Sequence, residues 1–288
     1  MGSSLVRLIV WLFPLSAFAF MMGVFFEMSI GMAEPTGWSY DAYGKLLNRY
    51  VDGQGMVDYS GLKADGTPLD NFVSNLSSIH PHMYENWNTK AKIAFWINAY
   101  NALTLKAIID HYPIKASFFK YFIYPKNSIR QIPGVWDKLM FTVMGRDYTL
   151  DGIEHKVLRA SFNEPRIHMA LVCAAKGCPP LRNEPYTGPK LDSALDDQAT
   201  KFLKNPDKFR IDRENRKVYL SPIFEWFGQD FVKNYGRGKE FPGFSERDKA
   251  ILNFVSRYLG PNDQEYLSRG GFSLEYLKYD WSLNDKKP

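Results

Sequence analysis

The strongest hydrophobic pattern downstream of the N-terminus predicts a long helix in the centre of the fold. Residues 89–112 read TKAKIAFWINAYNALTLKAIIDHY and are apolar nearly all round, so we expect this helix to be buried on most faces. Pro113 ends it, because a proline cannot continue the helical hydrogen bonds. Apolar residues at helical spacing and capping residues predict shorter helices over 67–79, 151–162, 189–204, 221–235 and 245–260.

Alternating patterns predict a smaller β component. Residues 140–150 alternate around Gly145, and residues 208–220 alternate on both sides of a polar turn, so each segment is predicted to form a hairpin. The apolar run 166–173 predicts a buried core strand, and 272–283 predicts a closing strand or an extended tail. Because helices and hairpins follow one another without a βαβ rhythm, we expect the α+β class.

The N-terminus has the pattern of an export signal. Residues 8–26 are almost wholly apolar, Arg7 precedes them, and Ala33 offers a small residue to signal peptidase. We expect residues 1–33 to be a signal peptide, or an uncleaved anchor to the inner membrane through 8–26, because this run approaches the bilayer thickness of roughly 30 Å. In both cases residues 34–288 are expected to form a single α+β domain in the periplasm.

The net charge and the motifs absent from the sequence limit the classes of partner and cofactor that we expect. The formal net charge of +5 is spread along the chain without a polybasic block, so weak attraction to anionic lipid or wall polymer can follow, and no nucleic acid is expected as a partner. Nucleotide-binding, serine-hydrolase and zincin motifs are absent from the sequence, so we expect no cofactor and no metal.

The two cysteines lie in the segment where function is most expected. Cys178 is followed by two prolines, so its thiolate could be stabilised by free N–H groups at a helix start, which makes it a candidate nucleophile. Alternatively, Cys173 and Cys178 form a disulfide, as export favours, and this short loop would stabilise the fold by about 2 kcal/mol. Redox chemistry is less favoured, because the spacing is not Cys-x-x-Cys.

Histidines are the candidate bases for a cysteine reaction. All five precede Cys178, which excludes a papain-like order of cysteine and histidine. His168 opens the predicted strand and is the first candidate for a base or an orienting residue, although strand alternation places it on the face opposite Cys173. A hydrogen bond to backbone is its alternative role. His155, on the predicted helix from 151, is the second candidate.

Three polar residues on the predicted helices complete the candidate site. Glu154 lies three residues after Asp151 in a capping-box-like start, and it either orients a partner or pairs with neighbouring loops. Asn98 and Asn101 project together from the apolar central helix. Their amides either hold the backbone of a loop or stabilise negative charge that develops on a substrate.

Four dispersed blocks carry a resemblance to a family. They are FWINAYNAL (95–103), IEHKVLR (153–159), HMALVCAAKGCPPL (168–181) and YDWSLN (279–284). Together with the pieces YGKLLNRYV and GMVDYSGL, they resemble the family catalogued as domain of unknown function 547, over roughly residues 40–284. The resemblance implies an exported bacterial protein and brings no activity with it.

These observations predict a pocket where the central helix, the helix from 151 and the segment 166–173 meet. The corresponding function is a cysteine-dependent hydrolase or acyl-transfer enzyme of the cell envelope, which acts on a small-molecule or peptide-like substrate. In the alternative, the protein is a non-catalytic periplasmic binding or scaffolding module with a structural pair of cysteines.

Overall fold

The computed structural model describes residues 37–116 and 120–286. The expected signal peptide or anchor, residues 1–33, lies outside these ranges. Within them, no helix combines the length and the apolar character that a bilayer crossing requires.

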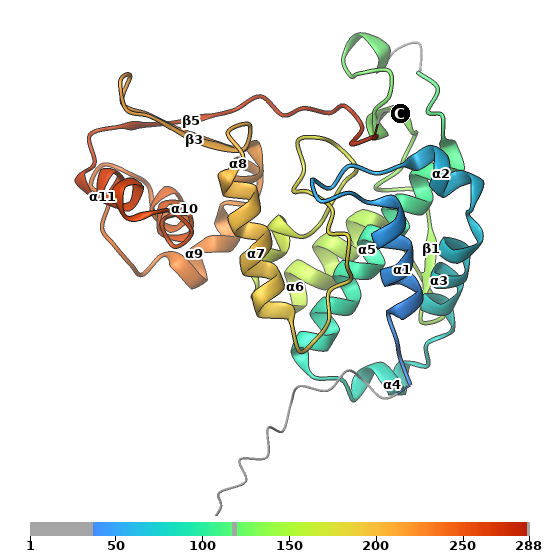
Figure 1. Cartoon of the computed structure of the whole chain (residues 1–288). Coiled ribbons are helices and arrows are strands. Elements are labelled where there is room, and N and C mark those ends of the chain that lie inside the picture. Colours follow the sequence, from blue (N-terminus) through green and yellow to red (C-terminus); the bar gives the residue numbers. More distant parts are fainter. Residues whose placement is uncertain (1–36, 117–119, 287–288) are drawn as a thin grey trace, which may run out of the picture. The chain divides into compact units, whose positions relative to one another are not determined.

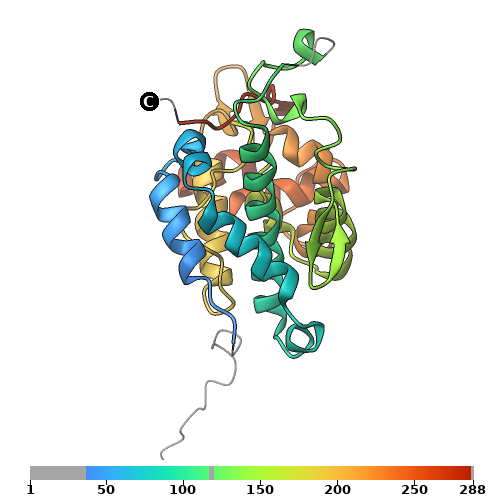
Figure 2. The ribbon, with the colours of Figure 1, turned by 90° about the vertical axis from the view of Figure 1, so that its right-hand side faces the viewer.

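Helix α5 (Thr89–His111) is the central helix that the sequence predicts, and nearly all of its residues from Ala91 to Ile109 are buried. It begins where the Asn88 side chain accepts a hydrogen bond from the Ala91 N–H, which satisfies one of the unpaired donors of the first turn. Helices α2 (Tyr59–Ala64), α3 (Thr67–Ser78) and α7 (Leu191–Lys204) pack against α5, and α1 (Asp41–Tyr50) packs on α3 (Figure 2). The short helix α4 (Pro81–Glu85) precedes α5.

Two small sheets supply the β component, so the α+β prediction is confirmed. Strands β1 (Phe141–Val143) and β2 (Arg146–Tyr148) form the first predicted hairpin, whose turn residues Met144 and Gly145 both have positive φ, as a tight two-residue turn requires. Strands β3 (Phe209–Asp212) and β4 (Lys217–Leu220) form the second hairpin. Strand β5 (Ser273–Tyr276) pairs in parallel with β4, which gives the order β3-β4-β5.

Four helices near the C-terminus enclose a second hydrophobic core with α7 and the three-stranded sheet. They are α8 (Pro222–Phe227), α9 (Gln229–Tyr235), α10 (Glu246–Ser256) and α11 (Pro261–Arg269). Helix α10 packs against α9 and α11 (Figure 1). The helix predicted over 221–235 is thus two helices that meet at Gly228, and α11 was not predicted from the sequence.

The predicted core strand over 166–173 is wrong. Residues Pro165–Met169 form a 3-10 helix, and residues 170–173 continue without regular secondary structure. The segment is nevertheless buried, because the Asn101 side chain takes the place of a strand partner: its amide donates to the Ala170 carbonyl and accepts from the Val172 N–H. The apolar run thus predicted correctly that the segment is buried. It did not predict the backbone conformation, because the hydrogen bonds of this backbone are made by a side chain and not by a strand.

The predicted helix from 151 is present but begins differently. Residues Gly152–Leu158 form a π-helix, which continues as the short helix α6 (Arg159–Ser161). The Asp151 side chain does not cap it, and the hydroxyl of Thr149 accepts from the Gly152 N–H instead. The wider π turn carries Glu154 and His155, which changes the directions expected for them from an α-helix.

Candidate functional site

A cavity of about 300 Å³ lies where the sequence predicts the pocket. The lining includes four of the six predicted site residues, Glu154, His155, His168 and Cys178. Its walls come from α5, the π-helix, the segment after the 3-10 helix, α8 and the C-terminal segment. Residues more than 100 positions apart in the sequence therefore face one volume.

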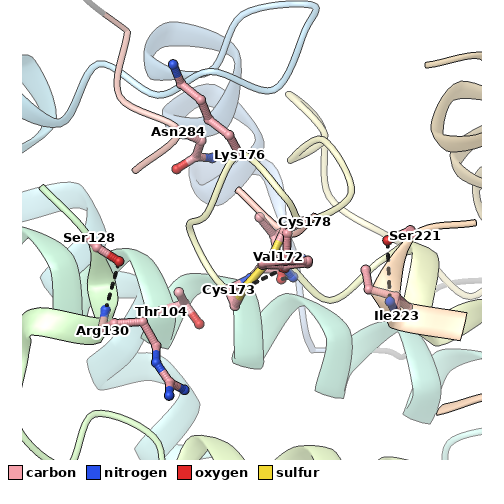
Figure 3. Close-up of a disulfide and its surroundings, with 12 residues drawn as sticks. Thr104, Ser128, Arg130, Val172, Cys173, Lys176, Cys178, Ser221, Ile223 and Asn284 are labelled. Carbon is pink, nitrogen blue, oxygen red and sulfur yellow. Dashed lines mark hydrogen bonds between the residues drawn. A yellow bond between two sulfur atoms is a disulfide. The ribbon is translucent and has the colours of Figure 1, made fainter. Parts of the chain in front are cut away.

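A disulfide joins Cys173 and Cys178 at the cavity wall (Figure 3). The loop between them turns at Ala174, which has a φ of 60°, a left-handed conformation that is uncommon for a residue with a Cβ. Cys178 is only 5% exposed, and the Cys173 N–H points at its Sγ over 2.9 Å. In this oxidised form Cys178 has no thiol, so the nucleophile predicted from the sequence is absent until the bond is reduced.

Tyr279 places its hydroxyl on the disulfide. Its Oη lies 3.1 Å from Cys178 Sγ and 3.3 Å from Cys173 Sγ. Because disulfide sulfurs carry no hydrogen, the tyrosine hydroxyl is the donor in both contacts. Burial raises the pKa of Tyr279 above its ordinary value, so the hydroxyl keeps its proton.

Backbone hydrogen bonds fix the C-terminal segment against the disulfide loop. The N–H groups of Lys176 and Gly177 donate to the carbonyls of Ser282 and Asp280, each over 2.7 Å. The N–H of Asn284 donates back to the Ala174 carbonyl. This pairing holds Tyr279 on one face of the loop, and Gly177 lets the ring approach closely.

Glu154 is a half-buried acid of the cavity. Burial raises the pKa of its carboxyl to about 7, although a hydrogen bond with Tyr100 and the charge of Arg159 act in the opposite direction. The nearby charges of Asp151 and Asp230 add to the increase. A carboxyl with such a pKa can both give and take a proton near neutral pH.

His155 lies between two charged side chains at the edge of the cavity. The guanidinium of Arg159 donates to its Nδ1 over 2.8 Å, and its Nε2 lies 4.0 Å from Asp151 Oδ1. Because Nδ1 accepts a hydrogen bond, the neutral ring carries its proton on Nε2. Burial and the charge of Arg159 lower the pKa of His155.

His168 is bound to Asp230, so its contacts differ from those of a base that serves Cys178. Its Nε2 lies 2.8 Å from Asp230 Oδ2, and its ring stacks on Phe227 with the centroids 4.2 Å apart. Burial lowers the pKa of His168, although Asp230 opposes this. Burial also favours the neutral form of Asp230, but the hydrogen bonds from His168 and Arg159 outweigh it and hold the pKa of Asp230 below its ordinary value.

Asn98 and Asn101 hold backbone and do not line the cavity. The Asn98 amide donates to the Tyr186 carbonyl and accepts from the Tyr186 N–H. Asn101 makes the corresponding pair of bonds with Ala170 and Val172. Both amides therefore have the first of the two roles that the sequence left open, and they anchor the loops on either side of the disulfide.

Aromatic rings form part of the cavity wall. Trp226, Tyr279 and Trp281 pack on one another with centroids 4.5–6.1 Å apart, and Trp226 is 46% exposed. The guanidinium of Arg130 lies 4.8 Å from the Trp281 ring and 5.3 Å from the ring of Trp136. The cavity thus combines flat apolar faces with a small number of charged groups, a composition that is common in ligand sites.

One family model matches part of this chain. Residues 84–203 match the family described as "Protein of unknown function, DUF547". The predicted resemblance is confirmed over this range, which includes three of the four sequence blocks and leaves YDWSLN at 279–284 outside. Neither the curated proteins nor the solved structures that were compared gave a match.

The DUF547 region supplies most of the cavity, but not all of it. Tyr100, Glu154, His155, His168 and both cysteines lie within the matched range, whereas Tyr279 comes from the segment beyond it. In the sequence, the only signal for Tyr279 and Trp281 was their place in the YDWSLN block of the family resemblance. No sequence signal indicated Asp230, which reaches His168 from α9.

We find no set of metal ligands in the part of the chain that the structure describes. Over residues 37–116 and 120–286, no group of three or more histidine, cysteine, aspartate or glutamate side chains is arranged to hold an ion.

Proposed function

We propose that the cavity is the active site of a hydrolytic enzyme of the cell envelope, and that Glu154 moves the proton in its reaction. One observation carries this proposal: a carboxyl with its pKa raised to about 7 by burial lines a cavity that a ligand can enter. Such perturbed acids are concentrated at functional sites. The disulfide supports a location in an oxidising compartment, as the export pattern predicts.

The chemistry follows from the two protonation states of Glu154. The ionised carboxylate accepts a proton from an attacking water molecule, and the acid then gives that proton to the leaving group. Tyr100 lines the same cavity and interacts with this carboxyl, so its hydroxyl lies beside the group that moves the proton. Arg130 and His155, at the same cavity, are placed to hold polar groups of the substrate.

The test compares hydrolysis by the wild type and by Glu154→Gln on chromogenic glycoside, ester and amide substrates. We expect one class to be turned over and the glutamine variant to lose at least about 100-fold in kcat/KM. The wild-type pH profile should have an inflection near 7 that the variant lacks. Glu214→Gln, in the exposed turn between β3 and β4, is the matched control and should retain wild-type activity.

Two results would contradict this function. One is a Glu154→Gln variant with wild-type kcat/KM. The other is a wild type that binds ligands in the cavity but hydrolyses none of the three classes, which is the behaviour of the binding module that the sequence left open.

A cysteine-dependent version of the reaction is a second candidate, because both sulfurs line the cavity beside Glu154. It requires an external thiol that reduces the disulfide to two thiols and is itself oxidised. Turnover that appears only with reductant, and disappears in Cys178→Ser, would support it. Equal turnover by the oxidised protein and by the Cys173→Ser/Cys178→Ser variant would remove it.

A further inference from the structure

A large groove adjoins the cavity on the other side of the disulfide. Its volume is about 960 Å³, and Cys178 and Tyr279 line both the groove and the cavity. The lining comes from residues 53–56, the loop 175–180, the end of α7 and the segment 277–280. Cys178 and Tyr279 therefore lie where the two volumes adjoin.

The groove is strongly basic. Two carboxylates, Asp207 and Asp280, face a larger set of cations in its lining. The cations are Lys176, Lys201, Lys204, Lys208, Arg210 and Lys278. A concentration of one sign of charge along a concave surface attracts a ligand of the opposite sign.

Most of these cations lack a carboxylate partner within residues 37–116 and 120–286. Lys201 pairs with Asp197 over 2.9 Å. Among the residues that the structure describes, none of the other five cations has a carboxylate oxygen within 4 Å. By contrast, two arginines outside the groove are paired: Arg159 with Asp230 and Arg182 with Asp197.

Lys208 is the buried member of the set. Only 6% of the residue is exposed, and its Nζ donates to the Lys176 carbonyl. An ammonium has three donors, and its burial is unfavourable unless opposite charges compensate for it. The nearby charges of Asp207 and Asp280 oppose the effect of burial on the pKa of Lys208 but do not outweigh it. Burial lowers the pKa of Lys208 to about 8, so the group is still mostly charged at neutral pH and would be stabilised by an anion.

The positions of the aromatic residues distinguish two possible polyanions, a single-stranded nucleic acid and an acidic polysaccharide. Sites for single-stranded nucleic acid place successive aromatic rings in the same groove as the cations, so that bases can stack. Here the groove lining has two aromatic residues, Phe202 and Tyr279, and Phe202 is fully buried. The cavity has more rings in its lining, among them the exposed Trp226, and the negative face of such a ring suits the C–H groups of a sugar.

We propose that this basic groove binds an acidic polysaccharide, one sugar residue of which enters the aromatic cavity. The acid groups of the chain lie along the unpaired cations, and Tyr279 is in contact with the chain where it passes from groove to cavity. Entry into the cavity rests on the proposed function, whereas binding in the groove does not depend on it.

The test measures binding of an oligogalacturonate and of a dextran sulfate oligomer by calorimetry, with neutral dextran of the same length as reference. Both acidic chains should bind and dextran should not, and raising the salt concentration from about 50 to about 300 mM should weaken binding about tenfold. Lys204→Glu/Lys278→Glu should weaken it by a similar factor. Lys45→Glu/Lys239→Glu makes the same change in net charge at exposed lysines outside the groove and should bind as the wild type does.

Three outcomes overturn the inference: equal binding of dextran, equal losses in the groove and control variants, or tighter binding of single-stranded oligothymidine than of either acidic glycan. Its failure is distinguishable from failure of the proposed function. If acidic chains bind in the groove but are not hydrolysed, the groove inference holds and the proposed enzymatic function fails. If hydrolysis depends on Glu154 but is unchanged in Lys204→Glu/Lys278→Glu, the proposed function holds and the groove inference fails.

Discussion

The hydroxyl of Tyr279 lies 3.1 Å from the Sγ of Cys178. This contact joins the C-terminal segment, beyond the matched DUF547 region, to the loop that carries both cysteines. Tyr279 and Cys178 both line the cavity and the basic groove. The predictions below test the parts of this arrangement separately.

Gly177 is required for the close approach of Tyr279. A Cβ at residue 177 would lie 2.6 Å from Tyr279 Cε1, closer than real Cβ contacts allow. We expect Gly177→Ala to displace the ring and to lower the free energy of unfolding by about 1–3 kcal/mol, measured by urea denaturation. Gly53→Ala is the control, because a Cβ there meets nothing within 4 Å. Equal effects of the two substitutions would contradict this account.

The disulfide should contribute modestly to stability. Its cysteines are five residues apart, and a loop of this length restricts the unfolded chain by about 2 kcal/mol. We expect Cys173→Ser/Cys178→Ser to lower the free energy of unfolding by this amount under oxidising conditions. With reductant present, the wild type and the variant should become similar, and a difference that persists there would mean that sulfur packing, not the crosslink, is responsible.

Glu154 should make the fold less stable as the pH rises. Its pKa is raised from 4.5 to about 7 in the folded state, so the folded protein binds the proton more tightly than the unfolded chain does. Stability is therefore lost between about pH 4.5 and 7, by roughly 3 kcal/mol at most. We expect Glu154→Gln to unfold at a higher temperature than the wild type at pH 8 and at a similar temperature at pH 4. Glu214→Gln should show no such dependence on pH.

Asp230 should act in the opposite direction. Hydrogen bonds from His168 and Arg159 hold its pKa below the ordinary value despite burial, so its contribution is present above about pH 4 and is lost as the pH falls further. We expect Asp230→Asn to lower the free energy of unfolding by about 2 kcal/mol at pH 7, and by less at pH 3. Asp263→Asn removes the more exposed pair with Arg213 and should cost no more than about 0.5 kcal/mol. Equal losses from the two variants would show that the position of Asp230 has no special role.

Several elements could be predicted because their patterns are local. The apolar run of α5 and the alternation around Gly145 each report which positions are buried, and both elements are present where the sequence places them. The run 166–173 reported burial equally well but was assigned the wrong backbone conformation. Its partner is the side chain of Asn101, and a pattern of apolar residues carries no information about such a partner.

Four of the six candidate site residues line one cavity, and all four lie in segments that the sequence singled out. Glu154, His155, His168 and Cys178 face one cavity, as the predicted pocket requires. Their roles could not be predicted, because a role depends on the neighbours. His168 contacts an aspartate of α9, and Glu154 lies in a π turn beside Tyr100.

The sequence by itself determined the α+β class, the central helix, the resemblance to the DUF547 family and the segments that bring chemistry to the site. The tertiary structure decided which groups meet: the hydroxyl of Tyr279 on the cysteine pair, Asp230 on His168, and the burial that raises the pKa of Glu154 to about 7. Periodicity records which face of an element avoids water. The pKa of a carboxyl and the contacts of an imidazole depend on groups from distant parts of the chain, which become neighbours only when the chain folds.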